Sequence, residues 1–140
     1  MIDTAPLLAV ASIVGGFGIN VLMFRIRREL HMRKQEERTW IPWADQLVIA
    51  AVSLSLITVL LLLAAPALSF IPSWIAPTLL AAAVALLLGF PPAILAHYRL
   101  LAFQKHAERR DNPEPSEKLC VVVTVLFALA MSVLVWTAAT

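Results

Sequence analysis

Charged residues are confined almost entirely to two short windows of this chain, and long uncharged stretches rich in Leu, Ala, Val and Ile lie between and beyond them. The windows span residues 25–45 and 99–118, and Asp3 is the only charged residue outside them. The uncharged stretches lack the strict alternation of polar and apolar residues that marks a half-buried or barrel strand. They therefore predict membrane-spanning helices, each of which needs about 20 predominantly apolar residues.

The uncharged stretches differ in how many membrane crossings they can hold. Residues 4–24 and 119–140 are each long enough for one helix, whereas residues 46–98 hold two helices if the stretch contains a turn. Three prolines between residues 66 and 77 supply that turn, because proline lacks an amide donor and interrupts a helix. We therefore predict four transmembrane helices, near residues 5–24, 43–65, 76–98 and 118–138.

Composition supports the same assignment. The chain is 61% apolar and only 14% charged, whereas a soluble domain contains about 25% charged residues. With a single cysteine and so many apolar residues, it is neither a disulfide scaffold nor a disordered chain. The sequence predicts an all-α integral membrane four-helix bundle, made of two transmembrane hairpins with helical cytoplasmic extensions and forming a single domain over residues 1–140.

An even number of crossings separates the two charged windows, so both windows must lie on the same side of the membrane. Because these windows hold every Lys and Arg, the positive-inside rule makes that side the cytoplasm. We expect a multi-pass protein of the plasma (inner) membrane, with cytoplasmic loops at residues 25–42 and 99–117 and both termini outside. Four tryptophans fit interfacial anchors, two at the inner interface and two at the outer one: Trp40, Trp43, Trp74 and Trp136.

The charged windows also predict structure outside the bilayer. Charges of alternating sign recur at intervals of four over residues 25–37, so the first helix should continue past the membrane. The third helix should continue likewise from Tyr98 to Arg109, until prolines and polar residues at 111–115 interrupt it. Arginines directly beneath the bilayer can attract anionic lipid headgroups. The candidates for this role are Arg25, Arg27, Arg28 and Arg99.

Rows of small or polar residues spaced by four recur on three of the predicted helices. In lipid, helices associate through close packing of small residues and through hydrogen bonds, so these rows are candidate packing surfaces. A row that the protomer does not use is available to a second copy or to another membrane subunit. The rows consist of Ser12, Gly16 and Asn20; of Ala81, Ala85 and Gly89; and of Thr124, Ala128 and Ser132. Pro91 and Pro92 predict a kink late in the third helix.

The sequence offers few groups for catalysis or ion coupling. No predicted helix carries an ionisable residue away from its ends, which counts against transport coupled to protons or sodium. Asp45 falls in the first turn of the second helix, where a carboxylate complements the helix dipole and needs no other role. The three histidines, His31, His97 and His106, match no metal-ligand or haem spacing. We therefore predict no metal site, no cofactor and no catalytic motif, and no nucleic-acid partner because acids are interleaved with the bases.

These features favour a non-enzymatic protein that acts through helix association, as an accessory or assembly subunit of a membrane complex or as a self-oligomerising module, in contact with membrane lipid. One alternative is an oligomeric channel or carrier for a small or lipophilic solute, with a polar path drawn from Asn20, Ser53, Ser55, Thr58 and Thr124. A second alternative is a membrane enzyme acting on a lipid-soluble substrate. Its candidate residues fall at one depth near the cytoplasmic interface: Arg25, His31, His97, Tyr98 and Arg99.

Overall fold

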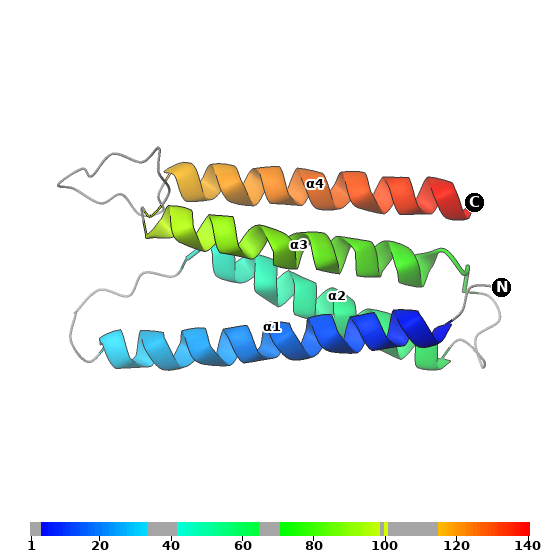
Figure 1. The fold of residues 1–140 in the computed structure, drawn as a ribbon, viewed down its shortest axis with the longest axis horizontal. Helices are drawn as coiled ribbons and strands as arrows, with labels where there is room; N and C mark the ends of the chain where they lie inside the picture. The colour runs from blue at the N-terminus through cyan, green and yellow to red at the C-terminus, as the bar shows by residue number, and fades with distance from the viewer. Residues whose placement is uncertain (1–3, 34–41, 65–70, 99, 101–114) are drawn as a thin grey trace.

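The computed structural model describes residues 4–33, 42–64, 71–98, 100 and 115–140. Within these residues the protein is all-helical and confirms the predicted four-helix membrane bundle (Figure 1). Each helix is long and apolar enough to cross a membrane. The helices are α1 (Thr4–Arg33), α2 (Ala44–Ala64), α3 (Ile75–His97) and α4 (Pro115–Ala139).

The starts of α2 and α4 follow the local signals in the sequence. A turn precedes α2, in which the N–H of Asp45 donates to the carbonyl of Pro42 at 3.2 Å. Pro115 is the first residue of α4, where the missing amide hydrogen costs nothing because the first amides of a helix lack intrahelical acceptors. An acidic residue stands in the first turn of each helix, Asp45 in α2 and Glu117 in α4.

The two predicted helical extensions have different outcomes. Helix α1 continues beyond the apolar stretch as far as Arg33, and the remainder of its predicted extension lies outside the described residues. Helix α3 ends at His97, so its predicted continuation through Tyr98 and Leu100 is wrong. The rest of that predicted extension, as far as Arg109, lies outside the described residues. The N–H of Leu100 donates to the carbonyl of Leu95 at 2.9 Å, which is the 6→1 hydrogen bond that closes many helix C-termini. This bond turns the chain away from the helix axis.

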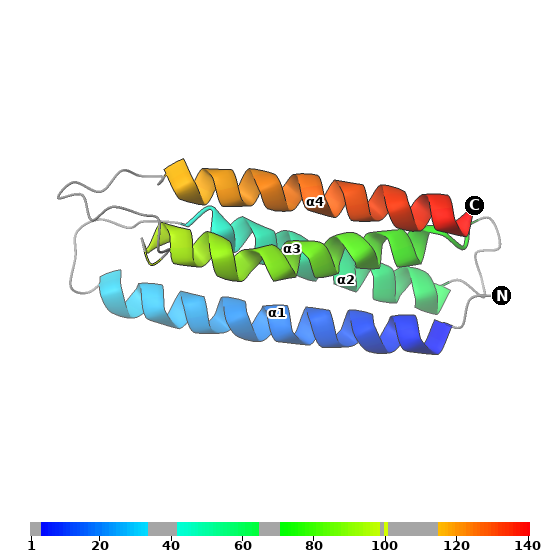
Figure 2. The ribbon, with the colours of Figure 1, turned by 45° about the horizontal axis from the view of Figure 1, so that its top comes forward.

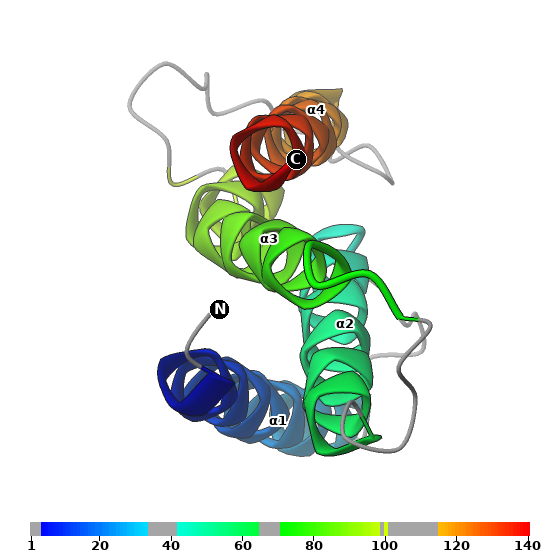
Figure 3. The same cartoon turned by 90° about the vertical axis from the view of Figure 1, so that its right-hand side faces the viewer.

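The helices form an open arc in which each one packs against the next along the chain (Figure 3). The α3/α4 interface is the most extensive, α1 makes only a minor contact with α3, and no packing between α1 and α4 occurs among the described residues. The end of α1 and the end of α3 lie beside the starts of α2 and α4 at one end of the bundle (Figures 1 and 2). The bundle therefore brings the helix ends that flank both charged windows to the same end.

The buried core is built mainly from alanine. Its cluster of buried residues joins α2, α3 and α4 and contains Ala44, Leu47, Ala51, Ala85, Leu86, Ala93 and Ala128. Small side chains let helix backbones approach closely, which is the main source of helix association when lipid removes the hydrophobic drive. Larger apolar side chains, including Leu126 and Leu129 on α4, point outward and are exposed in the protomer. Small side chains inside and large apolar side chains outside are expected of helices that are solvated by lipid.

Candidate functional site

Five polar side chains gather at the end of the bundle where α1 and α3 end and α2 and α4 begin. They are Arg25 from α1, Asp45 from α2, His97 and the adjacent Tyr98 from α3, and Glu117 from α4. We call these residues the polar cluster. Every helix contributes to it, although the helices themselves are almost wholly apolar.

Arg25 connects the first three helices. Its Nε lies 3.1 Å from Oδ1 of Asp45, and its Nη2 donates to Oδ2 of the same carboxylate at 3.4 Å. Its Nη1 donates to the hydroxyl of Tyr98 at 2.7 Å. Only 5% of Arg25 is exposed. A guanidinium presents several donors in a fixed plane, so it can hold a carboxylate on α2 and a hydroxyl after α3 at the same time.

Glu117 connects the last three helices and is fully buried. Its Oε1 accepts the backbone N–H of Ala44 at 2.9 Å, and its Oε2 lies 2.7 Å from Nδ1 of His97. Ala44 is the first residue of α2, so its amide has no acceptor within that helix. A side chain of α4 therefore caps the N-terminus of α2. One proton must lie between His97 and Glu117, because a bare imidazole nitrogen and a carboxylate oxygen would repel at this distance.

The contacts of the polar cluster follow a regular plan along the chain. Arg25 and Asp45 are 20 residues apart, and so are His97 and Glu117. Each pair joins the two helices of one hairpin at the hairpin's base. Two further hydrogen bonds, from Arg25 to Tyr98 and from Ala44 to Glu117, each span 73 residues and join one hairpin to the other. The cluster thus closes each hairpin and fastens the two hairpins together.

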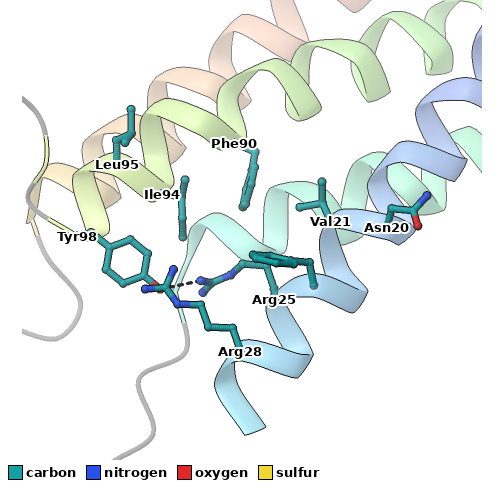
Figure 4. Close-up of a pocket in the computed structure, with 9 residues that line it drawn as sticks. Asn20, Val21, Arg25, Arg28, Phe90, Ile94, Leu95 and Tyr98 are labelled. Atoms are coloured by element: carbon teal, nitrogen blue, oxygen red, sulfur yellow. Dashed lines mark hydrogen bonds between the residues drawn. The ribbon is translucent and has the colours of Figure 1, made fainter. Parts of the chain in front are cut away.

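A groove of about 480 Å³ lies beside the polar cluster, between α1 and α3. Figure 4 shows the guanidinium groups of Arg25 and Arg28 with the Tyr98 ring at one end of this groove. The guanidinium carbon of Arg28 lies 4.6 Å from the centre of the Tyr98 ring, within cation–π range. Apolar side chains form most of the remaining wall: Val21, Phe24, Phe90, Ile94 and Leu95.

The α3/α4 contact brings together two of the predicted rows of small residues. Ala85, Thr124 and Ala128 are buried. A Cβ on Gly89 would overlap the Thr124 side chain, so this glycine permits the close approach of the two helices. The other members of the two rows, Ala81 and Ser132, are half-buried.

The predicted row on α1 lies on a different face from the one that packs. Ser12, Gly16 and Asn20 are exposed, and a Cβ on Gly16 would meet open space. Helix α1 packs on α2 through another set of small residues, since a Cβ on Gly15 or Gly18 would contact the side chains of Ser55 or Val52 respectively. The amide of Asn20 donates to the carbonyl of Gly16 at 2.9 Å, within its own helix.

The remaining predicted site residues are dispersed. Arg27, Arg28 and His31 are exposed on α1, whereas Arg99 and His106 lie outside the described residues. Helix α3 is continuous through Pro91 and Pro92, and a kink there stays a prediction. At the opposite end of the bundle Trp74 and Trp136 meet edge to face, with ring centres 6.3 Å apart.

Two of the four hydroxyls proposed for a polar path are bonded within their own helices. Thr58 donates to the carbonyl of Leu54 and Thr124 to that of Cys120, each at 2.8 Å. Ser53 is exposed. The buried Oγ of Ser55 has no hydrogen-bond partner among the residues that the structure describes.

Sequence reasoning did not identify the two acidic members of the polar cluster. Asp45 does more than complement the dipole of α2, because its carboxylate pairs with Arg25. Glu117 carries no feature in the sequence beyond its place at the start of the last apolar stretch, yet it is the most deeply buried charged group described. The sequence did contain a signal for this cluster, namely the depth of its residues in the membrane. Four of them lie within two residues of the end of an apolar stretch: Arg25, Asp45, His97 and Glu117. The topology therefore places them at one level.

Comparison with protein-family models, with curated proteins and with solved structures finds no match to this chain. Its chemistry therefore has to be read from the site itself. Among the described residues no group of three or more His, Cys, Asp or Glu side chains could hold a metal ion. His97 and Glu117 are enclosed by the helices, so a substrate cannot reach them, whereas Arg28 and the apolar wall of the groove are accessible.

Proposed function

We propose that this small polytopic membrane protein acts through helix association, as an accessory or assembly subunit of a membrane complex or as a self-oligomerising module. The observation that carries the proposal is the outward position of the row formed by Ser12, Gly16 and Asn20 on α1. Helix α1 stands at one edge of the arc and packs mainly on α2. Its outward face is therefore open to another transmembrane helix.

The chemistry of this face suits a second helix better than lipid. Small residues spaced by four allow a neighbouring backbone to come close. Asn20 has two amide hydrogens and a carbonyl oxygen, and the bond to Gly16 uses one of these hydrogens. A polar group without a partner in hydrocarbon costs several kcal/mol, so the rest of the Asn20 amide favours a partner that can accept or donate a hydrogen bond.

The channel and enzyme alternatives receive less support from the described residues. Thr58 and Thr124 are bonded within their own helices, and Ser55 is buried inside the protomer. His97 is engaged with Glu117 and inaccessible. The outward row on α1 is therefore the more specific feature.

The test is the mass of the assembly that the intact protein forms in mild detergent or in nanodiscs. We expect a mass greater than the 15.3 kDa protomer, either as a multiple of this chain or with an additional polypeptide. Gly16→Leu should reduce the assembled fraction, because a large side chain prevents close approach of a second helix. Ala130→Leu on α4 is the matched control, since Ala130 is also small and exposed.

Two results would oppose the proposal. One is a wild-type protein that remains a lone monomer with no co-purifying subunit in both media. The other is an assembly that Gly16→Leu and Ala130→Leu weaken to the same extent, because any lipid-facing enlargement would then have the same consequence.

A further inference from the structure

The groove between α1 and α3 combines two chemically distinct ends. One end holds two guanidinium groups, those of Arg25 and Arg28, with the phenol of Tyr98 between α3 and α1. Apart from Asn20, the rest of the wall is made of aliphatic and phenyl side chains, among them Phe24, Phe90 and Ile94. A lipid molecule has the same two parts, a polar headgroup and hydrocarbon chains.

The polar end carries an excess of positive charge toward the groove. Arg25 and Arg28 are the two charged residues that line it, and no acidic side chain does so among the described residues. Asp45 neutralises Arg25 from the α2 side. Arg28 rests on the face of Tyr98, and within the described part of the chain it has no carboxylate partner. A single anionic group fits this arrangement, because both guanidiniums lie against the same Tyr98 ring, with their carbons 5.8 Å and 4.6 Å from its centre.

The contacts of Arg25 position the ring against which Arg28 lies. Arg25 is held by Asp45 and bonded to the Tyr98 hydroxyl, which orients the phenol ring. The ring in turn carries the Arg28 guanidinium on its face. Arg25 and Tyr98 are therefore arranged before a ligand arrives, which lowers the entropy lost on binding.

Depth also agrees with a lipid ligand. Arg25 follows directly after the uncharged stretch 4–24, and Arg28 lies one turn beyond. The guanidiniums thus fall where the headgroups of one leaflet lie, while Phe24, Val21 and Asn20 follow the groove toward the membrane interior.

We propose that the groove binds one acidic glycerophospholipid, with its phosphate at Arg28, Arg25 and the Tyr98 hydroxyl and with an acyl chain along the apolar wall between α1 and α3. This site overlaps the helix-docking face only at Asn20, because Ser12 and Gly16 do not line the groove. Either proposal can fail without the other.

The experiment measures lipid retention by the intact protein with native mass spectrometry after exchange into mild detergent. Phosphatidylglycerol and phosphatidylcholine with identical acyl chains are compared, and inorganic phosphate is added as a competitor. The wild-type protein should retain one phosphatidylglycerol in preference to phosphatidylcholine, and millimolar inorganic phosphate should not displace it.

Two arginines provide a matched pair of variants. Arg28→Gln should reduce the preference for phosphatidylglycerol about fivefold, the size expected for one basic residue facing an anionic headgroup. Arg27→Gln removes the same charge from the adjacent residue, which is exposed but does not line the groove, and should retain the preference. A second pair tests the apolar wall: Ile94→Trp fills the groove and should reduce retention of both lipids, whereas Leu88→Trp, exposed elsewhere on α3, should not.

Three results would overturn the proposal. Equal losses for Arg28→Gln and Arg27→Gln would mean that surface charge alone attracts the lipid. Displacement by inorganic phosphate would identify a site for a free anion instead of a lipid. Equal retention of phosphatidylglycerol and phosphatidylcholine by the wild-type protein would mean that the groove does not select an acidic headgroup. Circular dichroism and elution volume establish that each variant is folded before its lipid retention is compared.

Discussion

His97 and Glu117 meet at 2.7 Å at the base of the second hairpin, and the same separation of 20 residues joins Arg25 to Asp45 at the base of the first. In both hairpins a basic side chain at the C-terminal part of one helix pairs with an acid in the first turn of the next. The acid also lies at a helix N-terminus, where the helix dipole favours negative charge. The two hairpins thus share one device for closing their ends, although the pairing residues differ.

Removal of the Glu117 carboxylate should be the most damaging change in the polar cluster. Glu117→Ala leaves the Ala44 N–H and the His97 ring without their partner in a buried place. Breaking a buried pair in this way costs about 3 to 5 kcal/mol. We expect a large decrease in the temperature of thermal unfolding in detergent. Lys118→Ala is the control, because Lys118 is exposed and its described contact is with the Trp43 ring. Similar unfolding temperatures for the two variants would contradict a stabilising role for Glu117.

Tyr98→Phe tests one of the two hydrogen bonds that join the hairpins. The substitution removes the hydroxyl that accepts from Arg25 but keeps the ring beneath Arg28. A hydrogen bond to a charged group contributes about 1.5 to 3 kcal/mol, so the unfolding temperature should decrease. The companion variant Asp45→Asn removes the carboxylate charge that pairs with Arg25. If the bonds form one network, the double variant should deviate from the sum of the two single changes; strict additivity would show that the two contacts act independently.

Gly89 provides a test of the α3/α4 interface. Gly89→Ala places a methyl group into the Thr124 side chain and should destabilise the bundle by about 1 to 3 kcal/mol, the usual cost of overpacking. Thr124→Ala in the same chain creates room and should recover part of the loss. Gly16→Ala is the control for helix propensity, because it meets open space and alanine favours a helix over glycine. A Gly89→Ala variant as stable as Gly16→Ala would contradict the close approach.

The orientation predicted from the positive charges can be measured by cysteine labelling in sealed vesicles, in a Cys120→Ala background. Leu30→Cys and Leu100→Cys are exposed and lie at the end of the bundle with the polar cluster, whereas Ser73→Cys is exposed at the opposite end. We expect an impermeant reagent applied from the cytoplasmic side to label the first two and not the third. Labelling of Leu30→Cys and Leu100→Cys from opposite sides would overturn the topology itself.

The sequence by itself determined the elements of this protein. The apolar stretches are long and contain no charged residue, and together they define four crossing helices. A charged side chain left in hydrocarbon would cost free energy. The positions of Pro42 and Pro115 set where α2 and α4 begin, since proline acts on the backbone locally. An even number of crossings brings the ends flanking both charged windows to one end of the bundle. These features can be predicted from the segments themselves, without information on which helices pack together.

Tertiary structure alone decided which faces meet. Helix α1 offers two neighbouring sets of small residues, and packing uses Gly15 and Gly18 while Gly16 faces outward. Spacing by four occurs on several faces of an apolar helix, so the choice depends on the surface of the partner and on the crossing angle. The partner of Asp45 and the partner of Glu117 were undetermined for the same reason. A charged residue at a helix end has several possible partners at its depth, and only the packed helices bring one of them within bonding distance.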